Sequence, residues 1–222
     1  MLNFSLTTPY SLACALLPCL AVFILRRQKG YPWQRLWTVL FCCYLWLVYD
    51  LTGAGGLSDI FLQLRIFAEL GIHSLSDLIG VLQTPDASFV FRTHVNLLPL
   101  QQLSFDFLLN IALFLPFGYL LPMLWRDHRN LRSVALSGAA FSLLIECSQL
   151  LTNRACDIND LIANTLGTVL GYFSCWFSGQ LFGKHLHRTP SGKHEPWLLI
   201  AASFAGMFFF YHPFWFSNAL HI

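Results

Sequence analysis

Long apolar stretches separated by polar connections run through most of the chain. Six of them are long enough, or nearly long enough, to cross about 30 Å of hydrocarbon as α-helices. They lie at residues 10–25, 35–52, 105–125, 133–152, 158–178 and 196–216, and the first is short. This pattern predicts an all-α fold, a polytopic membrane helix bundle with about six transmembrane helices.

The connection between the second and third stretches is long and has a pattern of its own. Within it, residues 58–70 read SDIFLQLRIFAEL, where apolar residues recur at helical spacing opposite Asp59, Gln63 and Glu69. That periodicity predicts an amphipathic helix at the outer membrane surface, with a lid packed on the bundle as the alternative. We therefore divide the chain into an N-terminal two-span hairpin at 1–55, an outer interfacial segment at 56–103, a three-span core at 96–178, and a cytoplasmic linker with the C-terminal span at 179–222.

Composition agrees with a membrane protein. Of the 222 residues, 56% are hydrophobic and 11% are charged, and the mean hydropathy is +0.57. The net charge of +2 is too small, and the basic residues are too scattered, to indicate nucleic-acid binding. The seven cysteines lie mostly in apolar stretches and form no CxxC pair, so the sequence predicts neither a disulfide framework nor a zinc site.

The basic residues predict the orientation in the membrane. Three of them, Arg65, Arg92 and Arg154, lie on one set of connections, and ten lie on the other set. The ten are Arg26, Arg27, Lys29, Arg35, Arg126, Arg129, Arg132, Lys184, Arg188 and Lys193. Because cytoplasmic loops carry an excess of Lys and Arg, the larger set is predicted to be cytoplasmic and both termini to be outside. The first stretch has its basic residues after it, the reverse of a secretory signal peptide, so we expect it to remain as a span.

Polar side chains form stripes on the last three stretches of the core. If 158–178 is a helix capped by Asp157, then Asp160, Asn164, Gly167 and Gly171 fall on one face at about 100° per residue. The preceding stretch carries Gly138, Ser142, Glu146 and Gln149 on one face, and the stretch before that carries Asp106 and Asn110. Small residues on these stripes would let the helices approach closely.

The depth of these side chains points to a shared site. At a rise of about 1.5 Å per residue, Glu146, Asn164 and Asn110 each lie roughly 9 to 10 Å from the outer end of their helix. We therefore expect the polar faces to converge beneath the outer surface and to line a pocket that opens outward. In the alternative, the polar groups only join neighbouring helices and Asp157 only caps. An ionisable group inside a membrane span is costly and by default marks function, which makes Glu146 the strongest candidate.

Four motifs lie in the same region: NLLPL at 96–100, NIALFLPFGYLLP at 110–122, IECSQL at 145–150 and RACDINDLIANTLGTVLGY at 154–172. They resemble the VanZ-like family of bacterial membrane proteins, over roughly a third of the chain. The resemblance implies a protein of the bacterial inner membrane and cell envelope. It also implies a link to antibiotic resistance, because the founding member is associated with low-level resistance to teicoplanin, a lipid-bearing glycopeptide.

The resemblance and the polar stripes select the same candidate residues. The ligand-binding candidates are Asn96, Asn110, Gln149, Arg154 and Asn164, and the candidates for catalysis are Glu146, Asp157 and Asp160. The metal, the cofactor and the oligomeric state are left open by the sequence.

Three functions compete for this site. The first is a non-enzymatic module that binds a membrane lipid or a lipid-linked or lipid-tailed envelope molecule, with Arg154 facing an anionic head group. The second is an enzyme acting on a lipid head group, with Glu146 as general base and Asp157 or Asp160 as its partner or as a ligand to magnesium or calcium. The third is proton-coupled transport through Glu146, which ranks lowest because no second half mirrors the first and the inner halves of the spans lack acids.

Overall fold

The computed structural model describes residues 4–25, 32–69, 71–74, 76–77, 95–96, 105–149, 156–182 and 192–213. The long helices are α1 (Phe4–Leu25), α2 (Pro32–Thr52), α6 (Phe105–Leu124), α7 (Leu131–Gln149), α8 (Ile158–Phe182) and α9 (Glu195–Phe210). The shorter elements are helix α3 (Leu57–Glu69), the 3-10 turn η1 (Arg126–His128), and the strands β1 (Val95–Asn96) and β2 (Cys156–Asp157).

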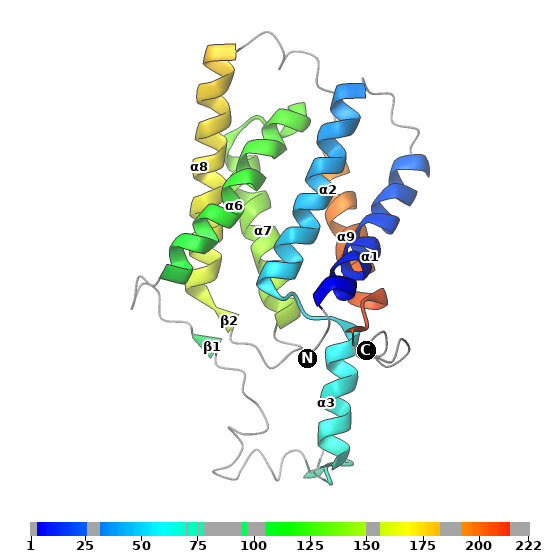
Figure 1. Ribbon diagram of the computed structural model, residues 1–222. Helices are drawn as coiled ribbons and strands as arrows, with labels where there is room; N and C mark the ends of the chain where they lie inside the picture. Colours follow the sequence, from blue (N-terminus) through cyan, green and yellow to red (C-terminus); the bar gives the residue numbers. More distant parts are fainter. Residues whose placement is uncertain are drawn as a thin grey trace.

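The long helices run alongside one another in a single bundle (Figure 1). On one side α6 packs closely with α8 and α7, and on the other α1 packs with α9 and α2. Four candidate spans, Thr7–Leu25, Gln34–Glu69, Phe105–Leu124 and Leu131–Gln149, combine sufficient length with high hydropathy in the described part of the chain. The predicted all-α membrane helix bundle is therefore confirmed, and the six predicted stretches correspond in order to the six long helices.

Several helix ends differ from their predicted positions. Helix α1 begins at Phe4 rather than at residue 10, and α8 continues to Phe182 rather than ending at 178. Helix α9 ends at Phe210 rather than at 216. Pro213 explains that end, because a proline disfavours helical backbone in the residue before it.

Aromatic side chains join the two sides of the bundle at its centre. The ring of Phe117 on α6 stacks on Phe141 of α7 with centroids 5.1 Å apart, and Phe41 of α2 meets Trp125 edge-on at 5.2 Å. Tyr49, also on α2, contacts Phe141 at 5.8 Å. Phe41, Phe117 and Phe141 are fully buried, so this cluster is the centre of the hydrophobic core.

Glycines allow α6 and α8 to touch backbone to backbone. A Cβ atom on Gly167 would overlap the carbonyl oxygen of Ile111, and one on Gly171 would overlap that of Leu115. On α6, a Cβ on Gly118 would overlap the carbonyl of Thr168. The predicted close approach through small residues is confirmed, and it fixes how the polar residues at the ends of these helices meet.

Helix α3 extends from the end of the bundle as a separate arm (Figure 1). It follows a turn in which Gly53 has a φ of 60°, and the carboxylate of Asp59 accepts a hydrogen bond from the Gly56 amide over 2.8 Å. None of its residues is buried, and only its start contacts α9. The predicted helix is present but is not a lid packed on the bundle, and its position at the membrane surface stays a prediction.

Candidate functional site

A short strand pair brings residues 95–96 to the start of α8. Strand β1 pairs with β2 in parallel, with Val95 opposite Cys156 and Asn96 opposite Asp157. The pair lies at the end of the bundle from which α3 projects (Figure 1). The backbones of two predicted site residues, Asn96 and Asp157, therefore lie side by side.

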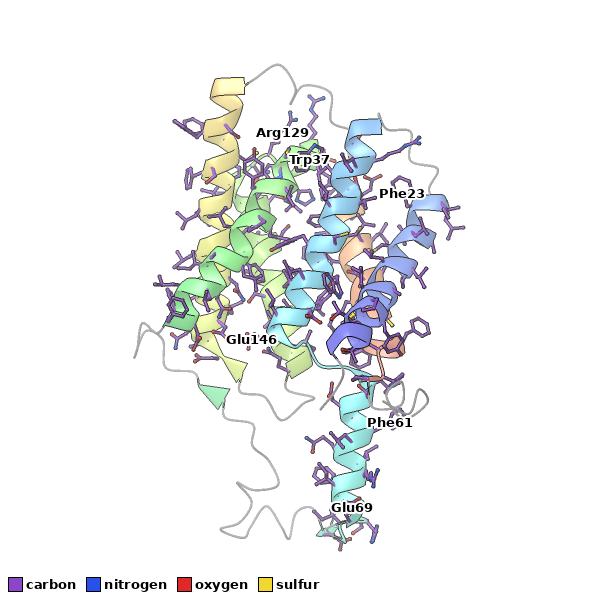
Figure 2. All side chains as sticks on the ribbon, in the orientation of Figure 1. Phe23, Trp37, Phe61, Glu69, Arg129 and Glu146 are labelled. Carbon is purple, nitrogen blue, oxygen red and sulfur yellow. The ribbon has the colours of Figure 1, made fainter. Side chains whose placement is uncertain are left out.

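Asp157 and Glu146 join the start of α8 to α7. The Asp157 carboxylate accepts a hydrogen bond from the Asn159 amide over 2.9 Å, so the predicted N-cap is confirmed. The backbone amide of Asp157 in turn donates to Oε2 of Glu146 over 3.3 Å. Glu146 is only 4% exposed, and Figure 2 shows it near this end of α7. A buried carboxylate is thus held against the first turn of α8.

Asn110 and Asp160 join α6 to α8 at the same end. The side-chain amide of Asn110 donates to Oδ1 of Asp160 over 2.7 Å. On α6 Asn110 directly precedes Ile111, whose carbonyl packs against Gly167, and on α8 Asp160 lies about two turns before Gly167, so the close helix packing holds both side chains in place. The predicted convergence of the polar faces of α6 and α8 is observed here.

Asn164 lies deeper, between α8 and α7. Its Nδ2 donates to the hydroxyl of Ser142 over 2.9 Å, and the hydroxyl of Thr168 donates to its backbone carbonyl over 2.9 Å. Asn164 is 2% exposed, and its Oδ1 has no hydrogen-bond partner within the described residues. A buried acceptor without a donor costs about 1–3 kcal/mol, so this oxygen is a place where a donor from a bound molecule would stabilise the protein.

Gln149 takes a different direction from the other candidates. Its Nε2 donates to the carbonyl of Thr52 over 2.9 Å, and the hydroxyl of neighbouring Ser148 accepts the Gly55 amide over 3.1 Å. Both contacts reach the turn between α2 and α3. The end of α7 therefore supports the base of the α3 arm.

The structure brings most of the predicted site residues together. Glu146, Asp157, Asp160, Asn110 and Asn164 meet where α6, α7 and α8 adjoin, whereas Arg154 lies outside the described residues. Ser142 was placed on the polar stripe of α7, but the sequence assigned no role to Ser148 and Thr168. All three are at most 3% exposed and bond to or beside site residues. The i,i+4 spacing from Asn164 to Thr168 could have indicated Thr168.

The arrangement is suited to hydrogen bonding. It offers two partly buried carboxylates at Asp157 and Asp160, the buried carboxylate of Glu146, and the Asn164 oxygen. In the part of the chain that the structure describes, no group of three or more His, Cys, Asp or Glu side chains is placed to hold a metal ion. Glu146 and Asn164 are packed inside the helices, so the outward-opening pocket stays a prediction.

A comparison with known protein families finds a match over the region that contains these residues. The model of the family described as VanZ/LLP1 matches residues 70–182, just over half of the 222 residues. The match includes all of α6, α7 and α8 and extends beyond the motifs quoted above. No curated protein and no solved structure matches the chain. With these three helices and their polar residues inside the matched region, the chain is a multi-pass membrane protein that belongs to the VanZ/LLP1 family.

Proposed function

We propose that the chain is a non-catalytic membrane module that binds a lipid-linked or lipid-tailed molecule of the bacterial cell envelope. The binding residues would be the polar groups of α6, α7 and α8, and the protein would lie in the inner membrane with this end facing out. Membership of the VanZ/LLP1 family supports an envelope role. A lipid-tailed glycopeptide such as teicoplanin belongs to the same class of ligand.

The single observation that carries the proposal is the state of Asn164. Its amide nitrogen is bonded to Ser142, while its oxygen is buried without a hydrogen-bond donor in the described part of the chain. If the amide only joined α7 to α8, we would expect a second protein donor at the oxygen, because buried polar groups are almost always hydrogen-bonded. A ligand hydroxyl or amide reaching this depth would satisfy it.

The surroundings suit a ligand that has both a polar head and a lipid tail. On α6 the side chains of Leu108 and Leu109 are 61% and 50% exposed, and on α8 those of Leu166 and Leu170 are 44% and 49% exposed. In a membrane bundle such side chains face acyl chains. A head group could therefore enter between the polar stripes while its tail stays in the bilayer.

The enzyme alternative rests on Glu146. A buried carboxylate beside the Asp157 amide could act as a general base on a bound head group. This reading requires the wild-type protein to convert its ligand, whereas the binding proposal requires only that the ligand is retained.

Lipids that copurify with the protein from native membranes test the proposal. Mass spectrometry of the wild type should show a retained envelope lipid that is depleted about fivefold or more in Asn164→Leu, since losing a buried hydrogen bond costs about 1–3 kcal/mol. Leu136→Ala, on the exposed face of α7, should retain it. Equal lipid profiles in all three folded proteins would refute the proposal. If the retained lipid is then added back to the purified proteins, its conversion by the wild type but not by Glu146→Gln would favour the enzyme.

A further inference from the structure

An apolar groove lies outside the family-matched region, among α1, α2 and α9. Its volume is about 280 Å³, and it is lined by Leu16, Leu17 and Leu20 of α1, Val39 and Cys42 of α2, and Leu199 of α9, among others. Phe23, another lining residue, lies toward the end of the bundle opposite to Glu146 (Figure 2). The groove is therefore separate from the candidate site on α6, α7 and α8.

The way α1 packs explains why the groove exists. A Cβ atom on Gly206 of α9 would overlap the carbonyl oxygen of Cys14, so these two helices touch backbone to backbone. That contact turns a different face of α1 toward α2. Along it, Ala13, Leu16, Leu17 and Leu20 recur at i, i+3, i+4 and i+7, and lining residues continue to Phe23, a length of about 15 Å at 1.5 Å per residue.

The walls of the groove present hydrocarbon. The hydroxyl of Thr38 donates to the Gln34 carbonyl over 3.0 Å, and the thiol of Cys19 donates to the Leu199 carbonyl over 3.6 Å. These polar groups therefore need nothing from a ligand. An enclosed apolar cavity of about 150 Å³ is enough to bind benzene, so a larger open groove in a membrane-spanning region suits an acyl chain.

A basic residue lies next to the groove on the same helix face. Arg35 is exposed and precedes Thr38, Val39 and Cys42 at the same i, i+3, i+4 and i+7 spacing, so it lies one turn beyond the groove. In the sequence, the connection between α1 and α2 adds Arg26, Arg27 and Lys29. Basic residues at the cytoplasmic membrane surface attract anionic lipids.

We propose that this groove holds one acyl chain of an anionic phospholipid from the cytoplasmic leaflet, with the lipid phosphate close to Arg35. The apolar side chains of the groove favour the acyl chain of the lipid. The guanidinium of Arg35 favours an anionic head group over a zwitterionic one. This site does not depend on the function proposed for α6, α7 and α8. It gives the N-terminal hairpin and α9, which lie outside the family match, a role in binding membrane lipid.

Native mass spectrometry with added lipids tests the site. The purified protein is titrated with phosphatidylglycerol or with phosphatidylcholine of the same chain length. The wild type should retain one phosphatidylglycerol at least tenfold better than phosphatidylcholine, and Val39→Trp, which fills the groove, should lose most of this binding. Leu36→Trp is the matched control, because Leu36 and Val39 are each 49% exposed on α2 but Leu36 does not line the groove. Arg35→Gln should reduce the preference between the two lipids while retaining binding.

Two results would overturn the proposal. Equal retention by the folded Val39→Trp and Leu36→Trp proteins would mean that the lipid binds nonspecifically around the bundle. A dimer in the wild type that dissociates in Val39→Trp would mean that a second copy of the chain covers the groove. Asn164→Leu, the variant that should deplete the envelope lipid of the α6, α7 and α8 site, should leave retention of phosphatidylglycerol unchanged, so a failure at that site can be told apart from a failure here.

Discussion

The side-chain amide of Gln149 donates a hydrogen bond to the carbonyl oxygen of Thr52 over 2.9 Å, which ties the end of α7 to the end of α2. Beside it the Ser148 hydroxyl accepts the Gly55 amide. A motif of the family-matched region therefore holds the turn from which the α3 arm begins.

Replacing Gln149 should loosen this turn. Gln149→Leu removes the donor to Thr52, and we expect a loss of about 1 kcal/mol, the usual value for a hydrogen bond between membrane helices. Hydrogen exchange of the peptide that contains Thr52 and Gly55 should become faster. Cys147→Ala, at an exposed neighbouring position, is the control and should leave exchange unchanged. Unchanged exchange in both variants would show that the bond does not hold the turn.

The backbone contact between α6 and α8 should be intolerant of added volume. Gly167→Ala places a methyl group against the Ile111 carbonyl, and overpacking of this kind costs about 1–3 kcal/mol or more. The melting temperature in detergent should fall well below that of wild type. Leu166→Ala, which removes volume from a 44% exposed neighbour, should melt close to wild type. If Gly167→Ala melted like Leu166→Ala, the helices would not be in contact as described.

Much of the site could be predicted because helix periodicity determines which residues share a face. The spacing of Asp160, Asn164 and Gly167 placed them on one stripe, and the structure shows that stripe against α6 and α7. Asp157 could be recognised as a cap from its position before an apolar stretch, which is a local signal. Signals of this kind depend only on nearby residues.

Other contacts depend on tertiary arrangement and have no local signal. The pairing of Asn96 with Asp157 involves strands of two residues, too short to show any periodicity. The bond from Gln149 to Thr52 joins residues 97 positions apart on different helices. On its own stripe Gln149 could equally have faced α8, and only the packing of α2 beside α7 decides between the two directions.

Labelling can test the predicted orientation. The end of α3 and the start of α9 lie at opposite ends of the bundle (Figure 1). In a chain without its native cysteines, Glu69→Cys should react with an impermeant maleimide in intact spheroplasts, because the loop charges place that end outside. Lys193→Cys should react only after the membrane is permeabilised. The reverse result would invert the topology.

His128 should make the stability of the connection between α6 and α7 depend on pH. It is 3% exposed, its Nδ1 meets the Ser133 hydroxyl at 2.9 Å, and its Nε2 meets the Lys193 carbonyl at 3.2 Å. Desolvation by burial lowers the pKa of His128 below its ordinary value near 6.5, despite the opposing effect of the bond to Lys193 and the charge of Asp127. The nearby Lys193 charge lowers it further.

The sign of the effect follows from this lowered pKa. Above about pH 6.5 the imidazole is neutral in both the folded and unfolded states, and its contribution to stability is complete. As the pH falls below that value the unfolded state takes up the proton first, so the free energy of unfolding decreases until the pH passes the folded-state pKa. Thermal melting between pH 8 and pH 5 should show this decrease, and His128→Asn should reduce it. The exposed His194→Asn is the control, and an unchanged pH profile in His128→Asn would contradict the prediction.

Substitutions of Glu146 can distinguish the hypothesis that the site binds a ligand from the hypothesis that it is catalytic. Its Oε2 accepts the Asp157 amide, so Glu146→Gln keeps an acceptor oxygen in place while removing the charge and the general base. Glu146→Leu removes the acceptor as well, and should lower stability by about 1 kcal/mol and speed exchange of the Asp157 amide. If the protein is a binding module, the Glu146→Gln protein should have the same melting temperature as the wild type and should retain as much lipid. If Glu146 acts as a base or holds a cation, Glu146→Gln should abolish activity while the stability of the protein stays at the wild-type level. Full complementation by Glu146→Gln would exclude both the catalytic and the metal readings, because a neutral amide supplies neither a base nor the charge that a cation needs.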